Sequence, residues 1–284
     1  MTVHGTGRGT AAITLLGVDF TSAPRRAKPI TVAIGSPSGD GFALQSLERI
    51  GDWAGFEALL ARPGPWLGGF DFPFGLPREA VEQLGWPVQW RALTAHCAGL
   101  GRERFRAALD DWRAPRPVGN KYAHRATDGP ANSHSPLKLV NPPVGLMFLE
   151  GAPRLAAAGV TVPGLAGGDL ARIALEAYPA LLARRVLGRE SYKNDAAAKQ
   201  TPARRRARAR LVSALAQAEV PGHRLEGDCG LLRELVRDPS GDALDAVLAA
   251  VQAARAWRLR MRHYGLPEQV DPIEGWILGT PPHP

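Results

Sequence analysis

Two apolar runs in this sequence each end at an aspartate that is followed directly by phenylalanine. The runs are LLGVDF at residues 15–20 and LGGFDFPFG at residues 67–75, and both have the composition of buried strands. A carboxylate buried without a partner costs several kcal/mol or more, unless it is paired, protonated or bound to a metal. The chain must therefore adopt a fold in which the charges of Asp19 and Asp71 are compensated.

The first third of the chain predicts part of an α/β sheet. The segment SPSGD between the second and third strands is typical of a hairpin turn. A right-handed crossover through the following helix would lay the fourth strand parallel to one of the first three. We expect strands at 12–19, 29–35, 41–48 and 66–71, and a helix at 52–62.

The last third of the chain adds a fifth strand and several helices. The fifth strand leads to Glu176, and Pro179 then opens a helix. The expected fold is therefore α/β, with a mixed five-stranded sheet flanked by helices. The later elements expected are helices at 200–219, 228–237 and 241–263 and a short apolar segment at 274–279 that packs back on the body.

The middle of the chain, about 85–165, has no clean hydrophobic period. It is dense in Pro, Gly, Trp and Arg, with one helix expected near 101–112. A long irregular stretch in a compact domain is usually a functional insertion or a cap. We therefore predict a single domain over residues 1–284 with an irregular insertion or cap at about 85–165. The polar loop 120–136 is either a solvated surface loop or a loop that faces the substrate.

The composition favours a cytoplasmic protein without a membrane anchor. An apolar content of 45% supports a core, and the N-terminal MTVHGTGRGTAA lacks the apolar centre of a signal peptide. There is no run of about 18 apolar residues that would predict a transmembrane helix. Cys97 and Cys229 lack metal-like spacing, so we expect both to be small buried hydrophobes in a reducing compartment. The sequence does not predict the oligomeric state.

Much of the net charge of +8 lies in the segment ARRRARAR at residues 203–210. A positive surface attracts polyanions, among them nucleic acid. Arg204, Arg205 and Arg208 therefore either contact a phosphate backbone or form a solvated helix face.

Two further acids lie on a predicted helix. Asp242 and Asp245 are three residues apart on one face, beside the apolar stripe. An acid near a helix N-terminus can simply act as a cap, which explains Asp242 more readily than Asp245. If the first and fourth strands are parallel neighbours about 4.8 Å apart, Asp19 and Asp71 project from the same edge, where ligands bind in open α/β sheets. Carboxylates this close repel unless a cation lies between them, and all-oxygen ligation suits Mg²⁺ or Mn²⁺.

Four motifs resemble those of a known family: GVDF, FDFPFGLP, EAYPALL and DALDAVLAA. In this order and spacing they are similar to the domain of unknown function 429 family, an uncharacterised, mainly bacterial family of predicted ribonuclease H-like nucleases. The resemblance covers roughly residues 13–263. The helix that contains DALDAVLAA also resembles that of Holliday-junction resolvases.

The resemblance implies a two-metal nuclease that acts on DNA or RNA. Asp19 would bridge two metal ions, and Asp71 and Glu176 would bind one or both. Asp245 would complete the second site, with Asp242 as an alternate ligand. Bound Mg²⁺ or Mn²⁺ would activate water and stabilise the leaving 3′ oxygen. The basic residues expected to bind substrate are Lys121, Arg125, Lys193, Arg204, Arg205 and Arg208.

The sequence leaves two other functions open. An ATP-dependent phosphotransferase of the actin and sugar kinase type shares this sheet, but it follows the first-strand aspartate with a Gly-rich phosphate turn, and DFTSAP has no glycine. A non-catalytic nucleic-acid-binding module would keep the fold and lose the chemistry, and the retained acids argue mildly against it. The aromatic rings at Phe20, Phe72, Trp86 and Trp90 either pack in the core or stack on single-stranded bases.

Overall fold

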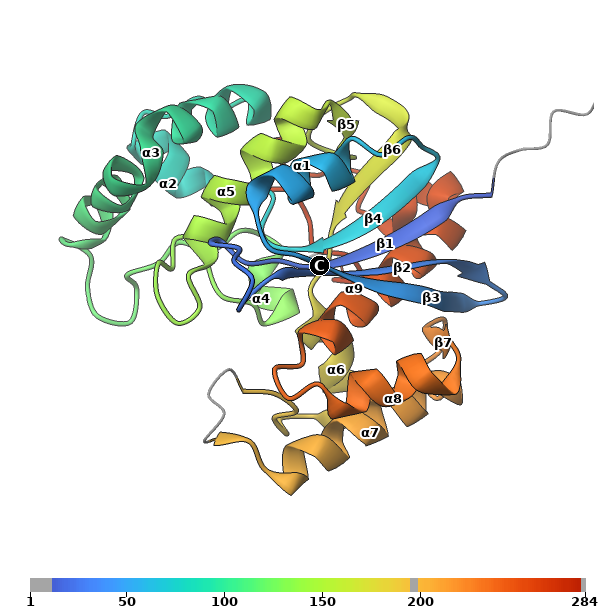
Figure 1. The fold of residues 1–284 in the computed structure, drawn as a ribbon. Coiled ribbons are helices and arrows are strands. Elements are labelled where there is room, and N and C mark those ends of the chain that lie inside the picture. The colour runs from blue at the N-terminus through green and yellow to red at the C-terminus, as the bar shows by residue number, and fades with distance from the viewer. Residues whose placement is uncertain (1–11, 195–198, 282–284) are drawn as a thin grey trace, which may run out of the picture.

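The centre of the molecule is a mixed seven-stranded sheet in the order β5-β6-β4-β1-β2-β3-β7 (Figure 1). The computed structural model describes residues 12–194 and 199–281, so the N-terminal segment on which the signal-peptide expectation rests lies outside the described residues. The strands are β1 (Thr14–Asp19), β2 (Ile30–Ser38), β3 (Gly41–Ile50), β4 (Trp66–Asp71), β5 (Val160–Thr161), β6 (Asp169–Glu176) and β7 (Arg224–Glu226).

The expected α/β class is confirmed, but the expected number of five strands is wrong. β5 and β7 contain only two and three residues, and they lie at the two edges of the sheet. Segments this short cannot show the alternating pattern that identifies a strand in a sequence. The five longer strands are the ones that the sequence predicts.

The pairing of the strands brings their acidic ends to one edge. β1 is antiparallel to β2 and parallel to β4, and β4 is parallel to β6. The fourth strand is thus parallel to one of the first three, as expected. Asp19 lies directly opposite Asp71 in the β1–β4 register, and Phe70 lies opposite Glu176. The segment 274–279 packs back on the sheet, since the Leu278 amide donates a hydrogen bond of 2.9 Å to the Glu176 carbonyl.

The helices of the second half follow the sequence prediction closely. The helix expected at 241–263 ends at Arg258, and a 3-10 helix (Arg260–Gly265) follows it. Side-chain caps fix several helix starts: Asp52, for example, accepts a hydrogen bond from the Gly55 amide. The helices are α1 (Trp53–Leu60), α2 (Arg78–Gln83), α3 (Trp90–Arg113), α4 (Asp128–Ala131), α5 (Val144–Ala158), α6 (Pro179–Leu187), α7 (Pro202–Ala216), α8 (Cys229–Arg237) and α9 (Asp242–Arg258).

Two apolar clusters fill the two faces of the sheet. Leu16 and Val18 point into the cluster that α1, α3 and α5 complete, whereas Leu15 points into the cluster that α6 to α9 complete. Figure 1 shows α1, α3 and α5 on one side of the strands and α6 to α8 on the other. The alternation along β1 follows from the period of two in a strand.

Glycines let α9 approach β1 and β4 closely. A Cβ added at Gly17 would lie 2.0 Å from the Ala246 carbonyl oxygen, and one at Gly69 would lie 2.5 Å from the Ala249 carbonyl oxygen. No side chain fits at either position, so the backbone of α9 rests directly on the sheet. This contact places the first turn of α9 beside the carboxyl ends of the two strands.

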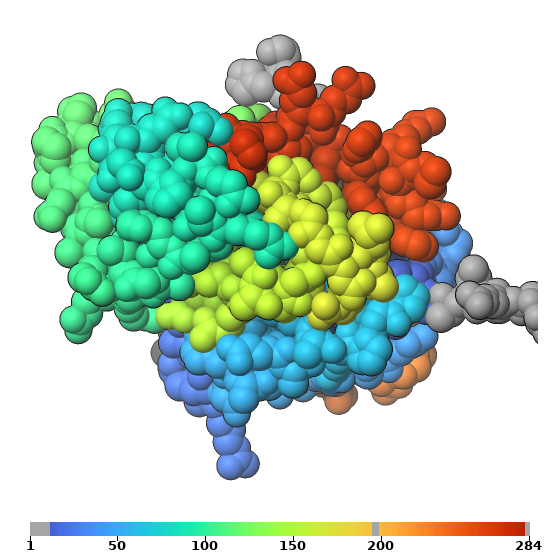
Figure 2. Space-filling model, turned by 90° about the horizontal axis from the view of Figure 1, so that it is seen from above, coloured from blue at the N-terminus to red at the C-terminus, as the bar shows by residue number. Residues whose placement is uncertain are grey.

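The middle region is largely helical rather than irregular. α3 changes direction at Gly101, which has φ 69°, and the predicted helix at 101–112 is its second part. α5 contains Pro153. These interruptions hide the helical period from a sequence analysis. Both helices pack in the same apolar cluster as the sheet, and Figure 2 shows the α2–α3 segment (teal) at one end of the molecule next to α5.

The two cysteines differ in their surroundings. Cys97 is buried as expected, but Cys229 is exposed, so the prediction that both are buried is wrong. Cys229 is the first residue of α8, where its side chain faces away from the core. Among the described residues, no helix combines the length and the apolarity that a membrane span requires.

Candidate metal centre

Three aspartates from separate elements meet at the carboxyl edge of the sheet. Asp19 ends β1, Asp71 ends β4, and Asp245 lies in the first turn of α9. One carboxylate oxygen of each lies within 4.8 Å of those of the other two. The parallel register of β1 with β4 and the close packing of α9 on Gly17 produce this grouping.

The carboxylates of Asp19 and Asp71 have no direct partner among the described residues. Neither makes a hydrogen bond or an ion pair with any residue that the structure describes. Asp245, in contrast, accepts a hydrogen bond from the Tyr192 hydroxyl and forms an ion pair with the Lys193 ammonium. Lys193 is therefore the cation that partly neutralises the group.

The electrostatics of this group oppose its full ionisation. The pKa of Asp71 is raised to about 7, chiefly by burial and then by the neighbouring Asp245, against the opposing effect of Lys193. Burial also raises the pKa of Asp19 well above its ordinary value; Lys193 opposes this rise, and Asp245, Asp242 and Asp71 add to it. Two acids that resist charge and have no partner fit a site built for a metal cation.

A cavity of about 690 Å³ opens over the three aspartates. Glu176 and Asp242 line the same cavity but are not members of the closely grouped set. The segment from Asn141 to Val144 and the side chains of Tyr178 and Lys193 form other parts of its wall. Its volume is within the range of small-molecule sites, which is roughly 300–1,000 Å³.

A family model described as "Protein of unknown function (DUF429)" matches residues 17–269. The chain belongs to the DUF429 family. The predicted family membership is thus confirmed, and the match includes all five predicted acids. No curated protein and no solved structure matches the chain.

In this DUF429 protein, Glu176 is held by an arginine rather than by the aspartates. The Arg125 guanidinium donates to both Glu176 oxygens, at 2.7 and 2.8 Å, and the Phe74 amide donates to Oε2 at 2.9 Å. Burial raises the pKa of Glu176, and Arg125 opposes that rise. The predicted strand end is correct, but the carboxylate lies in the cavity wall and not in the cluster.

Arg125 has a different role from the predicted binding of substrate. Its remaining N–H groups donate to Asp128 and to the Glu274 carbonyl, and only 3% of Arg125 is exposed. All five donors of the guanidinium are used inside the protein. Arg125 therefore anchors Glu176 and does not offer a free donor to a phosphate.

The predicted substrate residues on α7 lie away from the cavity. Arg204 and Arg205 do not line it, and Lys121, in the loop 120–136, does not line it either. Arg208 is 3% exposed and donates to the carbonyls of Tyr192 at 2.7 Å and Val236 at 3.0 Å, so the expectation that it faces outward is wrong. It lies three and seven residues before Leu211 and Leu215, and this helical spacing is the signal that identifies its buried face.

Sequence reasoning missed Tyr192 and assigned Lys193 to the substrate. The two residues are adjacent, and both bind Asp245. No periodic pattern marks them.

Of the two roles considered for the aromatic residues, the structure shows packing in the core. Phe20 and Phe72 are buried with ring centroids 4.5 Å apart, and Trp86 and Trp90 are buried as well.

Proposed function

We propose that this protein is a divalent-metal-dependent nuclease that hydrolyses phosphodiester bonds of DNA or RNA. The observation that carries the proposal is the group formed by Asp19, Asp71 and Asp245, whose ligand oxygens lie within 4.8 Å of one another. Three carboxylates at this separation provide the hard oxygen ligands that Mg²⁺ and Mn²⁺ prefer. Two of them have no partner among the described residues, so a cation can bind them without breaking an existing contact.

In this proposal, each acidic residue of the cavity has a separate role. Asp19 and Asp71 would bind the metal. Asp245 would become a third ligand if the Lys193 ammonium left the Asp245 carboxylate. Glu176 and Asp242 line the same cavity and would serve a second ion or its water ligands. Bound metal ions supply Lewis acidity, which activates water and stabilises the leaving oxygen of a phosphodiester. Arg125 favours the ionised form of Glu176 against the effect of burial and orients its carboxylate.

The order of the strands supports the inference of a ribonuclease H-like sheet. The five longer strands follow one another as β6-β4-β1-β2-β3, with β2 antiparallel to both neighbours and β4 and β6 parallel to β1. The resemblance of the sequence to predicted ribonuclease H-like nucleases implies a strand–Asp, a hairpin, a strand–Asp and a strand–Glu in this order. β5 and β7 extend the sheet at its edges.

Assays with oligonucleotides and with ATP, run side by side, test the proposal. We expect Mn²⁺ or Mg²⁺ to support cleavage of single-stranded DNA, duplex DNA or RNA, and EDTA to stop it. Asp71→Asn should abolish the cleavage, whereas the control Asp111→Asn, at an exposed acid of α3, should not change it. ATP hydrolysis without cleavage of any nucleic acid would favour the phosphotransferase instead. If Mn²⁺ neither binds nor supports cleavage, the nuclease proposal fails.

A further inference from the structure

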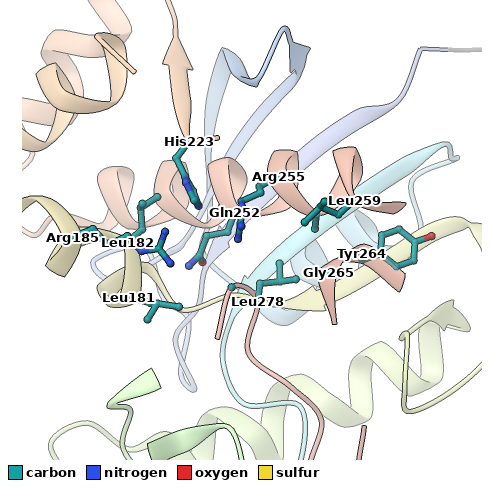
Figure 3. A pocket seen from close by; sticks show the side chains of 12 residues that line it. Leu181, Leu182, Arg185, His223, Gln252, Arg255, Leu259, Tyr264, Gly265 and Leu278 are labelled. Atoms are coloured by element: carbon teal, nitrogen blue, oxygen red, sulfur yellow. The ribbon is translucent and has the colours of Figure 1, made fainter. Parts of the chain in front are cut away.

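A second pocket lies along the C-terminal half of α9, away from the metal centre. Arg185 of α6, Arg255 of α9 and His223, which precedes β7, supply its polar side chains (Figure 3). The 3-10 helix and the segment at 278–279 close its other side. Arg255 comes ten residues after Asp245 on α9, so the pocket lies about 15 Å from the metal centre along the helix axis.

The arginines of this pocket have no anionic partner. The guanidinium groups of Arg185 and Arg255 make no hydrogen bond or ion pair with any described residue, and no described lining residue is an acid. Arg258, which lies beside them, donates to the Asp40 carbonyl at 3.0 Å. Burial lowers the pKa of Arg255, and repulsion from Arg185 and Arg258 lowers it further. Three positive charges thus gather here with no ion-pair partner among the residues that the structure describes.

A buried histidine completes the pocket. His223 is 4% exposed, and its Nδ1 lies 2.8 Å from the Pro221 carbonyl oxygen. When Nδ1 donates that hydrogen bond, Nε2 is left without a partner among the residues that the structure describes. Figure 3 shows the imidazole ring next to Gln252 and Arg255. Gln252 itself is fully used, because its amide exchanges two hydrogen bonds with the Tyr178 backbone.

We propose that this pocket binds a phosphate group. Guanidinium groups bind phosphate oxygens through paired, charge-assisted hydrogen bonds, and the Nε2 atom of His223 can donate a further one once it is protonated. The cavity volume is only about 20 Å³, which is room for one water-sized group, so a phosphate would bind at the mouth with one oxygen inside and a whole nucleotide would not fit. The phosphate belongs either to a small phosphorylated molecule or to a nucleic-acid backbone.

The ordinary explanation for these arginines is compensation of helix dipoles. Arg185 lies in the last turn of α6 and Arg255 in the last turn of α9, where positive charge is favourable. That role does not account for the buried imidazole of His223 beside them, whose Nε2 has no partner among the described residues. It also predicts a different result in the experiment below, because charges that serve the dipoles need no ligand.

The test is titration of the metal-free protein with inorganic phosphate in EDTA, against chloride at the same ionic strength. The variant is Arg185→Gln with Arg255→Gln. The matched control is Arg189→Gln with Arg206→Gln, which removes the same charge from exposed positions outside the pocket. By calorimetry, wild type and control should bind phosphate equally, and the pocket variant should bind it at least tenfold more weakly. Equal binding by all three proteins would show an adventitious ion only and would overturn the proposal.

A second readout needs no variant. Burial and the three arginines lower the pKa of His223 to about 4. A phosphate bound beside the ring should raise that pKa, which proton NMR of the wild type would detect. If saturating phosphate does not change the titration of His223, the proposal is wrong and the arginines serve the helix dipoles. The same conclusion follows if the pocket variant melts at a lower temperature but phosphate does not raise the melting temperature of the wild type.

Two further ligands identify the source of the phosphate. If the pocket serves small molecules, a nucleoside monophosphate should compete with inorganic phosphate and a short single-stranded oligonucleotide should not. If it serves nucleic acid, the oligonucleotide should bind the pocket variant more weakly than the control. The inference does not depend on nuclease activity, because Asp71→Asn should retain phosphate binding at this pocket even if the metal centre is inactive.

Discussion

At the scale of single residues, Asp19 shows how a buried carboxylate whose charge is unfavourable indicates a binding site for a cation. Its pKa is raised by burial and by neighbouring acids, Lys193 only partly opposes that rise, and no described residue makes a hydrogen bond or an ion pair with its carboxylate. We expect Asp19→Asn to leave the metal-free protein as stable as the wild type or slightly more stable, because one repelling charge is removed. The same change should weaken Mn²⁺ binding at least about tenfold, judging from the effect of losing even an indirect partner of a metal ligand, and should stop hydrolysis.

Thermal melts with and without Mn²⁺ decide between this role and a structural one. An aspartate that merely capped backbone amides would lose about 0.5–2 kcal/mol on replacement and would leave metal binding unchanged. If Mn²⁺ does not raise the melting temperature of the wild type, and Asp19→Asn melts lower without metal, the metal-centre interpretation of Asp19 is wrong.

Lys193 is a second single residue that controls the metal centre, but its positive charge opposes the binding of a cation. Its ammonium pairs with Asp245, and its side chain is 39% exposed, so it can leave the site without unfolding the protein. Burial opposes its charge, but Asp245, Tyr192 and Asp19 outweigh that effect and raise the pKa of Lys193. We expect Lys193→Gln to lower the free energy of unfolding of the metal-free protein by about 1–3 kcal/mol, since Asp245 loses its cation.

The same variant should bind Mn²⁺ more tightly, by about tenfold, because a competing positive charge is gone. Calorimetric titration of Mn²⁺ into both proteins measures this effect. Weaker binding by Lys193→Gln would instead make Lys193 a group that assists the metal rather than one that competes with it.

At the scale of secondary-structure elements, the contact between α9 and β1 determines where Asp245 lies. A Cβ at Gly17 would be 2.0 Å from the Ala246 carbonyl oxygen and 2.3 Å from the Ala250 amide nitrogen. Gly17→Ala must push α9 away from the sheet, and overpacking of this kind costs about 1–3 kcal/mol. We expect a lower melting temperature together with weaker Mn²⁺ binding, because Asp245 moves away from Asp19 and Asp71.

A glycine of helix α3, away from the contact between α9 and β1, provides the control. Gly99 lies in α3, and a Cβ added there would meet nothing within 4 Å. Gly99→Ala should leave metal binding unchanged and raise stability by up to about 1 kcal/mol, since alanine favours a helix over glycine. Equal Mn²⁺ affinity in the two variants would mean that the position of α9 does not set the geometry of the metal centre.

At the scale of the whole molecule, the buried acids couple folding, pH and metal. The pKa of Asp71 is about 7 in the folded protein, against an ordinary value of 3.8. A carboxyl whose folded pKa is raised stabilises the fold below its unfolded pKa, and this contribution is lost as the pH rises through the folded pKa. Relative to Asp71→Asn, the metal-free wild type should therefore lose stability between pH 3.8 and about 7.

Mn²⁺ should reverse this trend, because metal ligands must be deprotonated. The stabilisation that Mn²⁺ gives to the wild type should grow as the pH rises through about 7, and Asp71→Asn should show little of it. Urea unfolding over this pH range, with and without Mn²⁺, measures both effects. A wild type whose gain from Mn²⁺ is the same at every pH would exclude Asp71 as a ligand.

The sequence by itself determined the strands that carry the acids. The apolar runs that become β1, β4 and β6 end at Asp19, Asp71 and Glu176, as expected. The hairpin, the crossover helix and the start of α9 follow from turn residues, caps and periodicity. These signals are local, because each depends on residues only a few positions apart, and they can therefore be interpreted without knowledge of the fold.

Only the tertiary structure decided which charges pair. Arg125 pairs with Glu176, which is 51 residues away in the sequence, and Lys193 pairs with Asp245, which is 52 residues away. Neither pair therefore produces a local sequence pattern. Arg208, which composition places on a basic surface, is buried against the Tyr192 backbone. The physical reason is the cost of burying a charge, which depends on the partners that distant segments bring to it and not on the residues beside it in the chain.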